Sequence, residues 1–139
     1  RLEGARAAAR TRGLLRQLSI VPGDFSVESG HAAGTALLGS APVPTAAFCF
    51  SDQMALGVLA ACRDLGVRVP QDFSIVGFDD LASSRYLSPP LTTIAQPMCE
   101  IGARAVNLLL AIIGEVDVPH QQTLEFQLML RASTAAPAA

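Results

Sequence analysis

Two short apolar runs, each followed at once by acidic residues, constrain the fold of this chain more than any other feature. The run Pro44–Phe50 (PTAAFCF) lacks the alternation of a half-exposed strand, so it predicts a strand that is buried on both faces. Asp52 is a good N-cap for a following helix over Gln53–Leu65. Phe73–Phe78 (FSIVGF) predicts a second buried strand. A strand, a helix and a strand joined by short connections are typical of a parallel sheet.

The rest of the chain continues this alternation and predicts an α/β fold, a three-layer αβα sandwich around a parallel sheet. In open sheets of this kind, ligands bind beyond the carboxyl ends of the strands, where Ser51-Asp52 and Asp79-Asp80 lie. The remaining predicted elements are helices over residues 2–18, 28–38 and 98–113 and strands over residues 92–95 and 124–130.

Composition supports one compact domain and disfavours several classes of function. The chain is 50% hydrophobic, with a formal net charge of −2. No basic run follows Arg16, so the sequence offers no surface that would neutralise several phosphates. The three cysteines, Cys49, Cys62 and Cys99, are odd in number and widely spaced, which predicts buried free thiols in a reducing compartment and no disulfide or zinc site. No signal peptide and no membrane span are expected.

No catalytic constellation is visible, so we expect no enzymatic activity, no metal and no cofactor. The G-x-S-x-G, P-loop, H-E-x-x-H and C-x-x-C motifs are absent from the sequence. His31 and His120 lie in different segments and are interpreted as surface or capping residues. Asp79 and Asp80 are adjacent, so their side chains diverge on an extended chain and form no facing carboxyl pair. A carboxylate at a strand end suits sugar binding, but Asp79 alone is equally suited to capping the following turn.

The chain resembles the LacI/GalR family of bacterial transcriptional regulators over nearly its whole length. RLEG at residues 1–4 is similar to the family's R-x-x-G, and GDFSVESGHAAG at residues 23–34 matches its next helix entry. The other matching pieces are PTAAFCFSDQMALGVLAACRDLG, VRVPQDFSIVGFDD, YLSPPLTTIAQP, EIGARAVNLLL and LRAST. Several ordered motifs at compatible spacing make a chance match very improbable.

The resemblance implies a truncated, type I periplasmic-binding-protein-like module that senses an effector for a DNA-binding regulator. It implies that residues 1–96 form the C-terminal lobe, that 97–125 belong to a mostly missing N-terminal lobe, that 126–134 return, and that 135–139 are a disordered tail. Operator DNA would be bound only by a domain absent from this chain, in the cytoplasm. The alternative is a periplasmic sugar-binding protein of a transport system, which shares the fold.

The resemblance also implies an effector site in the cleft between the lobes, with a sugar or related metabolite as the ligand. Arg1 matches the family's cleft arginine, and Asp79 matches its acceptor of hydroxyls. Phe25 falls where members place a stacking aromatic ring, although a core role remains open. Ser51 falls where many sugar-responsive members have Asn, so this contact is in question. The remaining implied contacts are Gln96 at the crossover between lobes and Met98 just beyond it.

The family dimerises through this lobe, so the resemblance implies a homodimer in the intact protein. The implied interface residues are Leu56 and Ala60 on the predicted helix 53–65, together with Arg85 and Leu87 in the loop before Pro89-Pro90. Because most of the other lobe is missing, helix 98–113 is expected to expose one or more of its apolar residues, namely Ile101, Leu108, Leu109 or Ile112.

Overall fold

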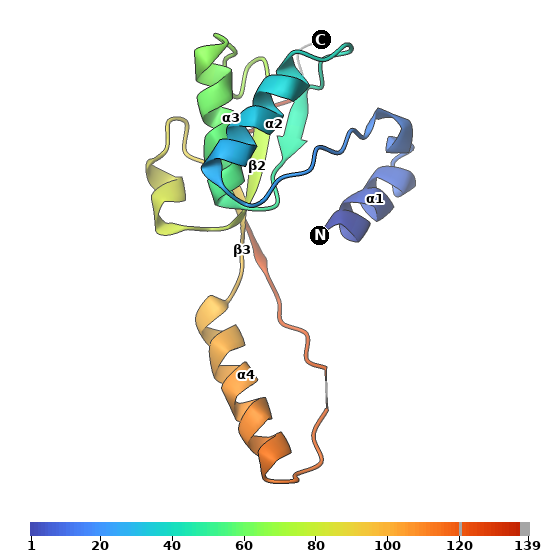
Figure 1. Cartoon of the computed structure of the whole chain (residues 1–139), viewed down its shortest axis with the longest axis vertical. Helices are drawn as coiled ribbons and strands as arrows, with labels where there is room; N and C mark the ends of the chain where they lie inside the picture. The colour runs from blue at the N-terminus through green and yellow to red at the C-terminus, as the bar shows by residue number, and fades with distance from the viewer. Residues whose placement is uncertain (120, 137–139) are drawn as a thin grey trace.

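A computed structural model describes residues 1–119 and 121–136, so His120 and the last three residues of the predicted tail lie outside the described part. The predicted α/β class is confirmed, with helices and strands alternating along most of the chain (Figure 1). The α-helices are α1 (Leu2–Thr11), α2 (Val27–Leu38), α3 (Asp52–Asp64) and α4 (Met98–Ile113). The strands are β1 (Ala46–Phe48), β2 (Ser74–Asp79), β3 (Thr92–Ala95) and β4 (Gln127–Met129), and the 3-10 helices are η1 (Leu15–Gln17) and η2 (Ala82–Tyr86).

The four strands form one sheet in the order β1-β2-β3-β4. The β1–β2 and β2–β3 pairs are parallel, as predicted, but β4 runs antiparallel to β3. The register places Asp79 opposite Ala95, so the carboxyl ends of β2 and β3 lie at the same edge of the sheet. The residues that follow these two strands are therefore neighbours in space.

The core lies between the sheet and α3. The side chains of Phe73, Ile75, Leu91 and Val58 are at most 2% exposed, and the free thiols of Cys49 and Cys62 are buried with them. Helix α2 packs closely on α3, because a Cβ at Gly57 would collide with the backbone of α2. These contacts bury most of α3 in the sheet and in α2, which explains why its sequence is apolar around most of its circumference.

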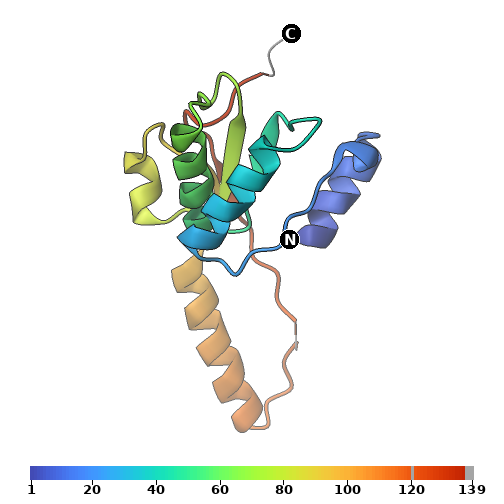
Figure 2. The same cartoon turned by 45° about the horizontal axis from the view of Figure 1, so that its top comes forward.

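Several predicted boundaries are wrong at the N-terminal side. The predicted helix over residues 2–18 breaks after Thr11, and Gly13 adopts a positive φ of 70° before the short turn of η1. Helix α1 stands apart from the sheet, on the side of the molecule opposite η2 (Figures 1 and 2). Strand β1 is not buried on both faces, since Phe48 is 42% exposed.

Helix α4 extends away from the sheet, as Figure 1 shows, and none of its residues is buried. Ile101, Leu109 and Ile112 are 37%, 56% and 46% exposed, which confirms the expected apolar surface, whereas Leu108 is half-buried. Among the described residues, no helix combines the length and apolar character needed to cross a membrane.

Candidate functional site

The carboxyl edge of the sheet brings together three of the predicted effector-site side chains, Arg1, Asp79 and Gln96. Asp79 is the last residue of β2, and Gln96 follows the last residue of β3. Because the two strands are parallel and adjacent, Gln96 Nε2 donates a hydrogen bond of 2.8 Å to Asp79 Oδ1. Arg1 Nη2 lies 3.4 Å from the same oxygen and forms an ion pair with Asp79. These residues are 78 and 17 positions from Asp79 in sequence, and only the fold joins them.

Two further contacts orient the Arg1 guanidinium. Its Nη1 donates to the backbone carbonyl of Phe50, just beyond β1. Its Cζ lies 3.9 Å from the centroid of the Phe78 ring, a cation–π contact. Phe50 and Phe78 were not among the predicted site residues, although Phe78 immediately precedes Asp79, which was a signal for it.

Phe25 lies beside this group but has a looser connection to it. Its ring centroid is 6.0 Å from Arg1 Cζ, and the residue is 54% exposed. The core interpretation of Phe25 is therefore wrong. Its backbone has a φ of 70°, a left-handed conformation that is uncommon for a bulky residue. An exposed aromatic ring next to a guanidinium offers an apolar face to a ligand.

The electrostatic environment of Asp79 contains opposing influences. Burial is the largest of them and raises the pKa of the carboxyl above its ordinary value of 3.8, while the charge of Arg1 lowers it. The charge of Asp52 raises the pKa again, and the hydrogen bond from Gln96 lowers it. Both described contacts use Oδ1, so within the described part of the chain Oδ2 accepts no hydrogen bond. The site thus holds an acceptor oxygen that is free for a ligand.

Ser51, and not Asp52 as predicted, is the N-cap of α3. The Ser51 hydroxyl accepts a hydrogen bond of 3.1 Å from the Met54 backbone N–H. Asp52, predicted as the N-cap, is the first helical residue and is only 3% exposed. Its carboxylate accepts hydrogen bonds from residues outside the helix. Sequence could not separate the two, because both residue types are good caps.

The neighbour of Asp79 faces a different partner. Asp80 Oδ1 accepts a 2.6 Å contact from Arg131 Nη2, and both side chains are nearly buried, at 15% and 14% exposed. Arg131 Nη1 also donates to the Leu91 carbonyl, at 2.8 Å. Asp79 and Asp80 both have positive φ, 120° and 55°, so the backbone is not extended here, and the two carboxylates contact different partners. Asp80 is therefore an anchored turn residue, while Asp79 faces the Arg1 group.

The other predicted contact and interface residues lie outside this group. Met98, at the start of α4, is 60% exposed, and its described hydrogen bond is from its backbone N–H to the Gln96 carbonyl. Of the predicted dimer residues, Leu56, Ala60 and Leu87 are half-buried and Arg85 is exposed. All four retain accessible surface for a partner.

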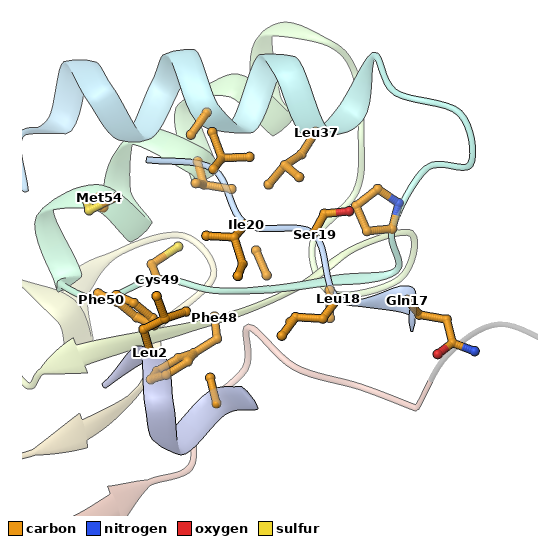
Figure 3. Close-up of a pocket in the computed structure, with 17 residues that line it drawn as sticks. Leu2, Gln17, Leu18, Ser19, Ile20, Leu37, Phe48, Cys49, Phe50 and Met54 are labelled. Atoms are coloured by element: carbon orange, nitrogen blue, oxygen red, sulfur yellow. The ribbon is translucent and has the colours of Figure 1, made fainter. Parts of the chain in front are cut away.

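An apolar cavity adjoins the polar group, because Phe50, whose carbonyl accepts from Arg1, is among its lining residues. It lies between α1, α2 and β1, with Leu2, Ile20, Leu37 and Phe48 pointing into it (Figure 3). Gln17 and Ser19 are the polar side chains among the described residues that line it. A polyhydroxylated ligand needs several convergent hydrogen-bonding groups, so this cavity does not suit one.

The three cysteines differ in their exposure to solvent. Burial raises the pKa of the Cys49 and Cys62 thiols to about 12 and about 11. Cys99 is exposed, so the prediction that all three thiols are buried is wrong for this residue. His31 lies at the surface, 3.0 Å from Asp64. Within the described residues, no group of three or more His, Cys, Asp or Glu side chains is placed to hold a metal ion.

Comparison with known proteins decides the family. The model of the periplasmic binding protein-like domain matches residues 1–134. This chain belongs to that family. Curated relatives of the domain include the HTH-type transcriptional repressor PurR of Actinobacillus pleuropneumoniae serotype 3 (strain JL03), 45% identical over 96% of this chain and 41% of the relative. The HTH-type transcriptional repressor CytR of Escherichia coli (strain K12) is 42% identical, over 98% of this chain and 40% of the relative. The chain therefore spans about two fifths of the length of these relatives.

Solved structures with the same periplasmic-binding-protein-like fold include LacI-type regulators, which confirms the resemblance. A dimeric Lac repressor with a C-terminal deletion and a point substitution aligns with a TM-score of 0.86 at 37% identity, over 99% of this chain and 50% of that one. A LacI family regulator from Enterococcus faecium with bound ribose gives 0.81 at 33%, over 96% and 50%. The CelR–cellobiose complex gives 0.83 at 37%, over 95% and 41%.

Proposed function

We propose that this chain is the effector-sensing and dimerisation part of a LacI-type transcriptional regulator, and that its effector is a sugar or a related hydroxylated metabolite. The observation that carries the proposal is the convergence of Arg1, Asp79 and Gln96 at the carboxyl edge of the sheet. The repressors among its relatives and the ribose and cellobiose complexes among its structural neighbours support it.

The chemistry of the group suits a ligand with neighbouring hydroxyls. Asp79 Oδ2 accepts a hydrogen bond from one hydroxyl, and the Arg1 guanidinium donates to a second oxygen. The exposed Phe25 ring covers an apolar ring face of the ligand. Ser51 offers little, because its hydroxyl is buried and already accepts from the Met54 N–H. Met98 contributes an apolar contact from the start of α4.

In this proposal residues 1–96 and 126–134 form one lobe, and residues 97–125 belong to a second lobe. The effector binds between the lobes and shifts the affinity for operator DNA, which is bound by a domain outside this chain. Two copies pair through a surface that includes Leu56, Ala60, Arg85 and Leu87. The regulator acts in the cytoplasm and catalyses no reaction.

A thermal-shift panel of pentoses, hexoses, disaccharides and nucleosides tests the effector class on the full-length protein. A ligand at 100 times its dissociation constant stabilises the folded state by about 2.7 kcal/mol. We expect a shift with at least one of these compounds. A flat response to the whole panel, together with a shift from a metabolite without hydroxyls, would overturn the sugar assignment.

Asp79→Ala tests the site itself. Loss of hydrogen bonds to a charged group costs about 1.5–3 kcal/mol of binding free energy. We therefore expect the dissociation constant of the responding ligand to rise roughly tenfold to hundredfold. The matched control is Asp72→Ala, which removes a carboxylate that is ion-paired with Arg68 at the surface, away from the site. Equal losses in both variants, or unfolding of Asp79→Ala, would instead assign Asp79 to the turn.

A further inference from the structure

Asp52 is a buried carboxylate whose hydrogen bonds all lead to other elements of the fold. Oδ1 accepts from the Thr93 hydroxyl of β3 at 2.5 Å. Oδ2 accepts from the Ser84 hydroxyl of η2 at 2.5 Å and from the Leu81 backbone N–H at 2.8 Å. The side chains of Ser84 and Thr93 are themselves completely buried. A single side chain at the start of α3 thereby ties together β3, η2 and the turn after β2.

The bond to Leu81 matters because of where Leu81 lies. It is two residues after Asp79 and ends the turn in which Asp79 and Asp80 have φ values of 120° and 55°. Left-handed backbone at non-glycine residues persists only where the surroundings enforce it. The Asp52 carboxylate holds this backbone in place at Leu81, and the contact between Arg131 and Asp80 holds it at Asp80.

A glycine in β2 leaves the space that the Asp52 carboxylate occupies. At Gly77, in the middle of β2, any Cβ would collide with Asp52 Oδ1. A β2 residue with a side chain would therefore push the carboxylate away from the three groups that donate to it. The glycine in the strand and the acid at the helix start form one arrangement, built from residues that are 25 positions apart in the numbering.

We propose that Asp52 is a positioning residue for the effector site: through the Leu81 N–H it sets the backbone that aims Asp79 at the ligand. The inference rests on the proposed binding of an effector at Asp79. Asp52 itself makes no ligand contact, because both of its oxygens are used inside the protein. Its effect on binding is transmitted through the turn.

The test measures the dissociation constants of four variants of the full-length protein for the responding ligand of the thermal-shift panel, by calorimetric titration well below each melting temperature. Asp52→Ala removes the acceptor for Leu81, and we expect the dissociation constant to rise at least tenfold. Asp52→Asn keeps one oxygen for Leu81, while its amide can donate to the Thr93 hydroxyl. We expect Asp52→Asn to bind within threefold of the unmodified protein.

The matched control is Leu59→Ala, which lies two helical turns further along α3 and removes buried apolar volume without touching the turn. We expect a lower melting temperature with a dissociation constant within threefold of the unmodified protein. A loss of affinity in Leu59→Ala equal to that in Asp52→Ala would show a general stability effect and overturn the positioning role. Unchanged affinity in folded Asp52→Ala would overturn it as well.

Gly77→Ala carries the test where Asp52→Ala does not fold, because its Cβ would displace the carboxylate without removing it. The same Cβ would also press on the buried Leu91 side chain, so the dissociation constant of Gly77→Ala is compared with that of Leu59→Ala, which changes the core alone. A rise of at least tenfold supports the proposal, and an unchanged dissociation constant overturns it. Failure of the proposed function gives a different pattern. In that case the unmodified protein itself does not respond to the panel, or Asp79→Ala binds normally.

Discussion

Two regions with apolar helices have opposite packing in this molecule. The packed lobe (residues 22–97 with 127–135) contains the buried core around Phe73, Ile75 and Leu91. The arm (residues 98–119 and 121–126 of the described chain) contains α4, is richer in Leu, Ile and Val than the packed lobe, and has no buried residue. The difference teaches that apolar periodicity predicts a helix and its apolar face but says nothing about where the partner of that face lies.

The largest contrast is expected in the free energy of unfolding. Phe73→Ala in the packed lobe removes a side chain that is 1% exposed, so we expect a loss of about 3–5 kcal/mol. Leu109→Ala in the arm removes one that is 56% exposed, and we expect a change within about 0.5 kcal/mol. Urea denaturation of this chain measures both. A large cost at Leu109 would break the comparison, because it would show that the arm is packed.

The arm and the packed lobe are also expected to differ in their contribution to self-association. Exposed apolar surfaces favour protein association, so we expect this chain to self-associate through α4. We expect Leu109→Glu combined with Ile112→Glu to lower its association constant more than tenfold, as measured by sedimentation. Leu65→Glu is the control, because Leu65 is 52% exposed on the packed lobe. Equal effects at both places would show that the arm has no special role in association.

Substitutions at the N-termini of α3 and α4 are expected to give a smaller difference in the free energy of unfolding. Ser51 caps α3 through its side chain, whereas Pro97 at the start of α4 makes no side-chain cap. We expect Ser51→Ala to lower the free energy of unfolding by about 1 kcal/mol, because α3 unfolds only with the core. Pro97→Ala should leave that free energy unchanged. The opposite ranking in thermal melts would show that α4 belongs to the cooperative unit.

The smallest effect is expected in the pH dependence at Asp79. Its pKa is raised in the folded state, so its charge destabilises the fold above that pKa, and protonation relieves this as the pH falls toward 3.8. We therefore expect Asp79→Asn to be slightly more stable than the unmodified chain at pH 7, with the advantage shrinking as the pH approaches 4. Urea denaturation across this range measures the difference, and an advantage that grows on acidification would contradict the sign.

Two elements are predicted correctly because residues near their ends determine where they begin and stop. Thr92–Ala95 and Met98–Ile113 have the predicted bounds, because proline and glycine mark the ends of the helix. Other predictions are wrong because the structure depends on distant residues. Asp52 accepts hydrogen bonds from Leu81, Ser84 and Thr93 instead of capping α3, and no local signal encodes these donors.

The candidate site divides in the same way. Asp79 could be predicted as a site residue because it lies at a strand end, and Phe78 could have been predicted because it precedes Asp79. Arg1 came only from the resemblance, because residues 78 positions apart share no local pattern. The reversed direction of β4 was missed for a related reason, since neither partner strand records the direction of the other in its own sequence.

That reversed strand determines how the arm is attached. The chain leaves the packed lobe through β3 and re-enters it through β4, and Ala95 pairs with Gln127 where the two crossings begin. Both attachment points of the arm therefore lie side by side at one edge of the four-stranded sheet. Gln96 is the first residue beyond that pairing on the outgoing strand, so the side chain bonded to Asp79 lies where the arm joins the packed lobe.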